Sequence, residues 1–150
     1  MTQEEKQVLL KDLCARLPYG VVVNYNGLAR PLFSVAPTQH FQITLDNALD
    51  GKHNGLAYVS LDVDGEEPKP YLRPMSSMTE EESNELESIT FPLMEKDWDG
   101  NENPACIRWI DIPKYMDFML SHHFDFMGLI PKDLAIEVTE SNNSYEQNKS

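Results

Sequence analysis

The residues with the clearest potential for chemistry are two histidines and a carboxylate that lie close together in the chain, His122, His123 and Asp125. Imidazole and carboxylate groups bind zinc and can act as general bases, so this cluster is a candidate site for a metal-dependent enzyme. Adjacent residues on a helix point about 100° apart, however, and do not converge as an i, i+4 pair does. Imidazoles near a helix C-terminus also interact favourably with the helix dipole, which is a purely structural role. We predict no metal and no catalytic residue here, and keep the metal site, which His40 and His53 could complete, as the alternative.

Other motifs that carry chemistry are incomplete in this sequence. It has no Gly-x-x-x-x-Gly-Lys phosphate loop, no Gly-x-Gly-x-x-Gly turn, no Gly-x-Ser-x-Gly elbow and no Cys-x-x-Cys pair. The oxygen-rich segments that begin at Asp46 and Asp97 do not combine the sixth-position glycine and twelfth-position glutamate that an EF-hand loop requires. We therefore predict that the protein uses no cofactor.

A compact group of large side chains precedes a strongly acidic segment. Tyr, Arg and Met are enriched in the cores of protein interfaces, so this group is a candidate anchor for a protein partner. Core contacts beneath a connecting segment explain it equally well. The interface candidates, with the neighbouring acids, are Tyr71, Arg73, Met75, Met78, Glu80, Glu81, Glu82 and Glu85.

The negative charge of the chain is concentrated in its centre. The 150 residues include 25 acidic and 12 basic side chains, a formal net charge of −13. Residues 1–61 are neutral, whereas residues 62–102 carry −10. Such a charge disfavours direct binding to nucleic acids or to anionic membranes. The central acids either keep the protein soluble or form an electrostatic surface for a basic partner.

Composition also indicates the compartment and the class of protein. The length suits one domain, and no apolar run approaches the ~20 residues of a membrane span. The acidic start of the chain does not resemble a signal peptide, and two cysteines, Cys14 and Cys106, are too few for a disulfide framework. We predict a cytoplasmic protein.

The N-terminal segment predicts a helix. Thr2-x-x-Glu5 has the form of a capping box, and leucines recur at helical spacing from Leu9 to Leu17. Pro18 ends the helix. Cys14 falls among these leucines and is predicted to be a small buried core residue.

Strands are predicted next. Segment 21–35 predicts a hairpin around the tight-turn signal Asn26-Gly27, with Pro31 making its second strand an edge strand or a broken one. Alternating apolar residues over 41–46 and 57–64 predict two more strands. An antiparallel sheet is the simplest result.

Two later helices follow the sheet. Thr79-x-x-Glu82 is a second capping box and predicts a surface helix. Pro92 and residues 97–104 are predicted to form a polar connection, and residues 106–110 a strand. Asp111-Ile112-Pro113 then opens an amphipathic helix.

We therefore predict an α+β fold, with the N-terminal helix packed on a small antiparallel sheet of three to five strands and two later helices. Residues 134–138 form a short strand or helix that closes a single domain over 1–138. Residues 139–150 are polar and are predicted to be a disordered tail.

Three sequence blocks carry a resemblance to a known kind of protein. They are KDLCARLPYGV (11–21), YLRPMSSMTEEE (71–82) and HFDFMGLIP (123–131). Together they resemble an uncharacterised family of small hypothetical proteins of gut-bacterial genomes, prophages and phages. The resemblance implies a small cytosolic protein associated with phages and carries no catalytic residues over to this chain.

The leading hypothesis is a non-enzymatic module that binds a basic protein, with no direct contact to nucleic acid or membrane. A more specific version is a phage-type inhibitor whose acids imitate nucleic-acid charge at a basic host site. The alternatives are the metal-dependent enzyme and a structural or accessory phage component. The oligomeric state stays open.

Overall fold

The computed structural model describes residues 1–36, 41–63, 65, 67–96 and 98–147. The helices, 3-10 turns and strands are, in chain order, α1 (Gln3–Arg16), η1 (Leu17–Tyr19), β1 (Val22–Tyr25), β2 (Leu28–Ala36), β3 (Gln42–Leu45), β4 (Ala57–Ser60), β5 (Lys69–Leu72), η2 (Met75–Ser77), α2 (Glu80–Ile89), β6 (Thr90–Lys96), β7 (Glu102–Ile110), α3 (Ile112–Ser121), β8 (Ile136–Glu137) and α4 (Ser144–Gln147).

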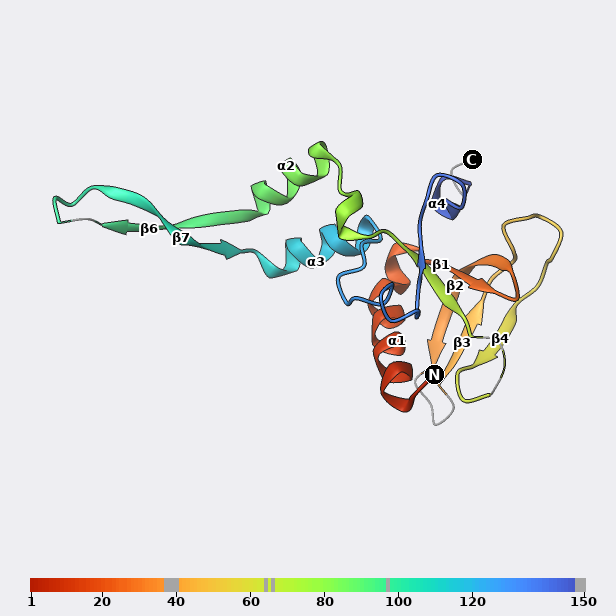
Figure 1. Ribbon diagram of the computed structural model, residues 1–150. Coiled ribbons are helices and arrows are strands. Elements are labelled where there is room, and N and C mark those ends of the chain that lie inside the picture. The colour runs from red at the N-terminus through yellow and green to blue at the C-terminus, as the bar shows by residue number, and fades with distance from the viewer. Residues whose placement is uncertain (37–40, 64, 66, 97, 148–150) are drawn as a thin grey trace.

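The predicted α+β fold is confirmed, and its sheet is larger than predicted. Six strands follow the order β4-β3-β2-β1-β5-β8. Neighbours are antiparallel except β5 and β8, which run parallel with Tyr71 opposite Ile136. Asn26 and Gly27 both have positive φ, which is the conformation a tight two-residue hairpin turn needs. Helix α1 lies beside this sheet (Figure 1).

Helix α1 is capped as predicted, but Cys14 does not lie in the core. The Thr2 hydroxyl accepts from the Glu5 backbone, and the Glu5 carboxylate accepts from the Thr2 backbone. The buried face of α1 contains Leu9 and Leu13, whereas Cys14 is exposed. One residue turns the helix by about 100°, so Cys14 points away from the face that Leu13 presents to the sheet.

Pro31 lies in an interior strand, so the prediction of an edge or broken strand is wrong. β2 pairs with β1 on one side and β3 on the other. The Pro31 carbonyl accepts from the Asp46 backbone N–H (2.9 Å), just past the last residue of β3. The N–H and the carbonyl of one residue point to the same side of a strand, so the side on which Pro31 lacks an N–H faces β3. This side falls where the pairing of β2 with β3 ends. The Asp46 carbonyl there accepts from Arg30 Nη1 (3.0 Å) instead.

The main hydrophobic core lies between α1 and the sheet. Its buried residues are Leu9, Leu10, Leu13, Val21, Val23, Leu32, Ile43, Leu45, Val59, Leu61, Leu72, Leu129, Leu134 and Ala135. One charged pair is buried beside α1: Arg16 Nε donates to Asp12 Oδ2 (2.7 Å), and Arg16 Nη2 donates to the Phe124 carbonyl (2.6 Å).

Residues 80–121, which we call the arm, protrude from this body (Figure 1). The arm consists of α2, the two-stranded ribbon β6–β7 and α3. The predicted surface helix, the amphipathic helix and the strand within β7 are confirmed. The predicted polar connection is wrong at Pro92, which lies in β6 opposite Arg108, and over the described part of 97–104 it is a turn and the start of β7.

A second apolar cluster attaches the arm to the body. Phe118, Met119 and Phe124 form its buried centre. Partly buried side chains from α2 and α3 and from neighbouring segments pack against this centre, namely Met78, Leu86, Ile89, Tyr115 and Phe126. The ribbon itself begins beyond this cluster, where the Asp111 backbone donates to the Ile89 carbonyl.

The C-terminal segment differs from the predicted disordered tail over its described part, 139–147. Tyr145 Oη donates to the Tyr71 carbonyl (2.5 Å) and accepts from the Val22 backbone (3.3 Å). Ser144 is buried. One aromatic ring and its hydroxyl therefore fix a segment whose composition is otherwise polar. Residues 148–150 lie outside the described part of the chain.

Candidate functional site

The candidate site lies where the arm joins the body, and Arg73 is at its centre. Just after β5, the Arg73 backbone donates to the His123 carbonyl (2.8 Å) and accepts from the Asp125 backbone (2.8 Å). This pairing brings the interface candidates and the histidine cluster, about 50 residues apart in the sequence, to the same place. The Arg73 guanidinium lies over the Phe124 ring, 4.4 Å from its centroid.

Glu82 holds this arginine with two hydrogen bonds. Arg73 Nη1 and Nη2 donate to the two carboxylate oxygens, each at 2.7 Å. Glu82 also completes the predicted capping box of α2, because it accepts from the Thr79 backbone (3.0 Å). His122 Nδ1 lies 3.0 Å from Glu82 Oε2. The hydrogen bonds from Arg73, and then those from Thr79, hold the pKa of Glu82 at about 2.

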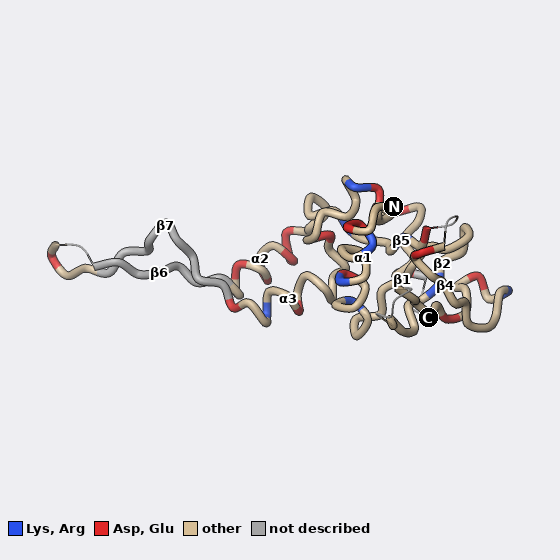
Figure 2. Tube along the Cα trace, turned by 90° about the horizontal axis from the view of Figure 1, so that it is seen from below, with Lys and Arg blue, Asp and Glu red and all other residues tan. Residues whose placement is uncertain are grey.

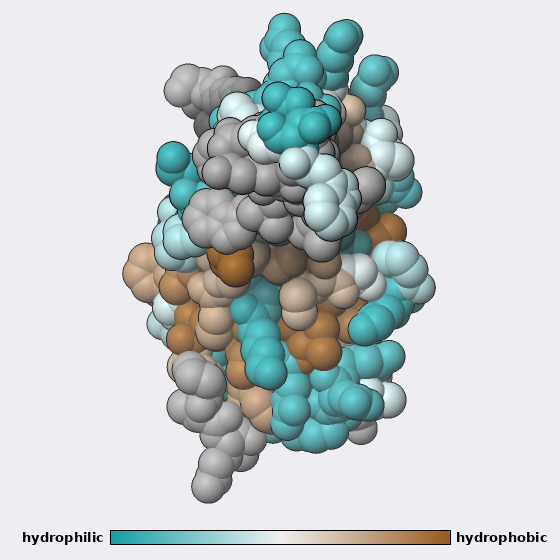
Figure 3. Space-filling model, turned by 90° about the vertical axis from the view of Figure 1, so that its left-hand side faces the viewer, coloured by the Kyte–Doolittle hydropathy of each residue, from teal (hydrophilic) through white to brown (hydrophobic). Residues whose placement is uncertain are grey.

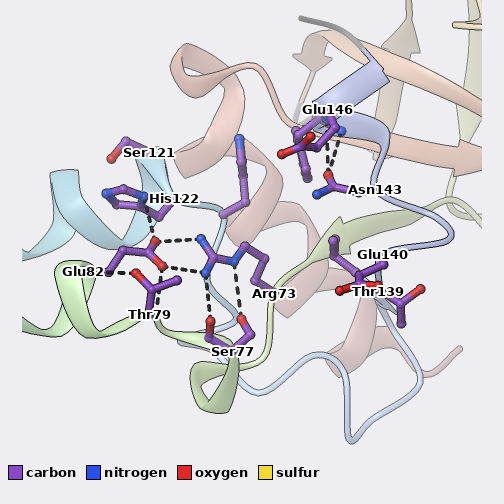
Figure 4. A pocket seen from close by; sticks show the side chains of 13 residues that line it. Arg73, Ser77, Thr79, Glu82, Ser121, His122, Thr139, Glu140, Asn143 and Glu146 are labelled. Carbon is purple, nitrogen blue, oxygen red and sulfur yellow. Dashed lines mark hydrogen bonds and ion pairs between the residues drawn. The ribbon is translucent and has the colours of Figure 1, made fainter.

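A cleft of about 660 Å³ opens beside this pair. One wall comes from the arm and its base, with Arg73, Glu82 and His122. The opposite wall is the C-terminal segment, with Glu140 and Asn143 among its lining residues. Figure 4 shows Glu82 and His122 pointing toward one another on one side, and the C-terminal residues across the gap. Most of the side chains that line the cleft are polar, and Val138 and Tyr145 add apolar surface to its C-terminal wall.

The histidine cluster does not converge on a metal position. His122 faces Glu82, whereas the His123 ring stacks on Tyr145 at 3.7 Å between centroids. Asp125 accepts from the backbone of the turn that follows it, at 2.7 and 2.9 Å. Within the described part of the chain, no three His, Cys, Asp or Glu side chains are placed to hold a metal ion. His53 is paired with Asp50 (2.6 Å) in the loop before β4, and His40 lies outside the described residues.

His123 is held in an unusual environment. Its backbone φ is +61°, a region that residues with a Cβ rarely adopt. Its ring is largely buried, and Nδ1 has no hydrogen-bond partner. Burial, with the positive charges of Arg16 and Arg73, lowers the pKa of His123 to about 4. At neutral pH the ring is therefore uncharged.

The interface candidates divide into buried and exposed residues. Tyr71 is only 8% exposed, and Met78 packs in the cluster at the base of the arm. These two residues, together with the Arg73–Glu82 pair, are structural contacts. The remaining candidates stay on the surface, namely Met75, Glu80, Glu81 and Glu85.

The acidic region of the sequence separates into two places in the structure. Asp62 and Glu67 lie on the body, where they pair with Lys6 (3.3 Å) and with the N-terminal amine (3.1 Å). The acids of α2 lie on the arm (Figure 2). From the sequence, the whole arm carries eleven acidic and three basic residues, a formal charge of −8. The charge excess is therefore carried mainly by one protruding element.

Sequence reasoning missed two parts of the molecule that bear on function. The C-terminal wall of the cleft depends on Tyr145, and a lone aromatic residue in a polar tail was the signal for it. Trp98 was also missed. Its side chain is 104% exposed, as much as in an isolated residue, in the turn between β6 and β7.

Comparisons of the chain with family models, with curated proteins and with solved structures find no match. None of the helices in the described residues combines the length and the apolarity needed to cross a bilayer.

Proposed function

We propose that this protein is a non-enzymatic module that binds a basic protein through its acidic arm. The observation that carries the proposal is the placement of exposed acids on a helix that stands away from the body. Glu80, Glu81 and Glu85 are all exposed on α2. Figure 3, which looks at the molecule from the arm side, shows hydrophilic residues at the top of this face and again at its lower right, with apolar residues between them.

The contacts at the base of the arm support a structural role for the residues that resemble catalytic groups. Arg73 is held by Glu82 and Ser77, and Asp125 is held by backbone donors. A carboxylate with a pKa near 2 exchanges protons poorly at neutral pH. These side chains fix the orientation of α2 relative to the body, which keeps the exposed acids in one arrangement. Such preorganisation lowers the entropic cost of binding.

Charge complementarity selects the class of partner. An arm with a formal charge of −8 attracts a positively charged surface and repels nucleic acids and anionic membranes. The more specific form of the proposal is an inhibitor that occupies a nucleic-acid site of its partner, as the phage resemblance suggests. In that form, duplex DNA displaces the protein from its partner, and continued binding in excess DNA excludes it.

The test is affinity capture with matched charge-reversal variants. The double variant Glu80→Lys/Glu81→Lys reverses two exposed charges on the arm. Glu4→Lys/Glu137→Lys makes the same change in net charge on the body, and Glu4 lies in the first turn of α1, as Glu80 and Glu81 do in α2. We expect one captured protein to be lost with the arm variant and kept with the body variant. Loss with both, or with neither, contradicts the proposal.

A further inference from the structure

Trp98 occupies the turn at the far end of the arm. The register of the ribbon ends at Lys96 opposite Glu102, and the described residues 98–101 lie between the two strands. Gly100 has φ +81°, a conformation that glycine adopts without strain and that such turns require. The ribbon projects this turn away from the body (Figure 1).

Full exposure is an unfavourable state for this side chain. Tryptophan buries 150–250 Å² in cores and interfaces, and it is enriched among residues that dominate binding energy. Trp98 is more exposed than the other large apolar side chains on the described surface, including Tyr58 at 78% and Val63 at 69%. Its position at the end of a ribbon also separates it from the core of its own chain. The indole is therefore placed to be covered by another molecule.

The residues around Trp98 specify the chemistry of that molecule. Four acids, Glu95, Asp97, Asp99 and Glu102, surround it in the sequence, against one base, Lys96. This negative charge, together with the formal charge of −8 on the arm, favours a basic surface on the partner. A Lys or Arg side chain of such a surface can lie over the indole ring as a cation–π contact. A pocket that accepts the tip of the arm is thus apolar in its centre and basic at its rim.

We propose that Trp98 is the anchor residue of the arm and inserts into an apolar pocket, rimmed by Lys and Arg side chains, on the partner protein. This inference rests on the proposed function and adds to it the residue that contributes most of the affinity. A second copy of this chain is a poor occupant because two arms of −8 repel. The cavity between α2 and α3, about 430 Å³, is lined by Glu85 and Asp117 against Lys114, so it lacks a basic rim.

A displayed library of random peptides tests the anchor without knowledge of the partner. Peptides are selected on the full-length protein at low salt, and the binders are measured against variants. We expect binders that combine Lys or Arg with large apolar residues. Trp98→Ala should weaken their binding at least about 30-fold, as for a hot-spot residue. Tyr58→Ala, which removes an exposed aromatic ring from the body sheet, should leave the affinity unchanged.

The outcomes separate this inference from the proposed function. If the peptides bind the wild type and Trp98→Ala with equal affinity, Trp98 is not the anchor. If binding is nevertheless lost with Glu80→Lys/Glu81→Lys in the same experiment, the proposed role of the acidic arm still holds. Loss with Trp98→Ala alone supports the anchor and contradicts the role of α2. A library that yields no binder contradicts both. Because the indole is fully exposed, Trp98→Ala should unfold at the wild-type temperature, which confirms that any loss reflects binding.

Discussion

Glu82 shows how one side chain can do several structural tasks at once. It binds both guanidinium nitrogens of Arg73, closes the capping box with Thr79 and lies against His122. From the sequence, Glu82 was predicted to close a capping box and was also named among the acidic interface candidates. The pairing with Arg73 appears only in the structure, because Arg73 comes from a different element.

Removal of the Glu82 charge should therefore destabilise the protein, whereas removal of a neighbouring charge should not. Glu82→Gln weakens two charge-assisted hydrogen bonds, with an expected loss of about 1–3 kcal/mol in the free energy of unfolding. Glu81→Gln, at an exposed position of the same helix, should change it by less than about 0.5 kcal/mol. Urea denaturation of both variants measures the difference. Equal values would mean that the Arg73–Glu82 pair does not hold the arm.

His123 should make stability depend on pH. Its pKa is about 4 in the folded protein, against 6.5 for an unperturbed histidine. Between these values the unfolded chain binds more protons than the folded one, so stability is complete above about pH 6.5 and falls as the pH drops toward 4. The expected loss is on the order of 2 kcal/mol, because partial exposure of the ring reduces the effect of the full shift.

The variant His123→Asn separates this effect from the titration of carboxylates. Asparagine tolerates the positive φ at this position and does not titrate. Its free energy of unfolding should therefore be flatter than that of the wild type between pH 6.5 and 4. Identical slopes for the two proteins would show that His123 is not buried in its neutral form.

The elements of the fold were largely predictable, and the exceptions have identifiable physical causes. Local signals, such as the two capping boxes and the Asn26-Gly27 turn, act within a few residues and were interpreted correctly. The strand position of Pro31 and the order of the segment around Tyr145 were predicted wrongly, because both depend on partners far along the chain. Pro31 is tolerated where β3 stops, and Tyr145 is fixed by strands β1 and β5.

Tyr145 is expected to hold the C-terminal segment in place. Tyr145→Phe keeps the ring but removes the hydroxyl that bonds to the Tyr71 carbonyl and the Val22 N–H, leaving both backbone groups without this partner. We expect a loss of about 1–3 kcal/mol in stability and faster proteolysis within 139–147. Limited proteolysis followed by mass spectrometry locates the cleavage. Unchanged protection would show that the segment is anchored in another way.

Helix α1 carries a buried ion pair whose energetic role can be measured. Asp12 and Arg16 are 1% and 0% exposed, and burial raises the pKa of Asp12 although Arg16 opposes this. Arg16→Met leaves a buried carboxylate without its cation and should cost about 3–5 kcal/mol. The double variant Asp12→Leu/Arg16→Met should recover most of that loss. If the double variant is no more stable than the single one, contacts beyond the pair, such as that of Arg16 with Phe124, dominate.

At the scale of the whole molecule, the structure assigns the net charge of −13 to particular parts. The arm carries −8, and some acids of the body are paired locally. Counting charges along the sequence located the excess of acidic residues in 62–102, but it could not show that only part of that region protrudes. The candidate site is similar: its residues were named from the sequence, whereas their meeting at the base of the arm follows from the pairing of Arg73 with 123–125.

The most direct test of the acidic arm is the salt dependence of binding to the captured partner. Isothermal titration at 50 mM and 300 mM NaCl compares the wild type with Glu80→Lys/Glu81→Lys. Exposed charges are screened within a few ångströms at high salt, so the wild-type affinity should fall about tenfold or more. The variant should bind weakly at both concentrations. A wild-type affinity that is the same at low and high salt would contradict an electrostatic role for the arm.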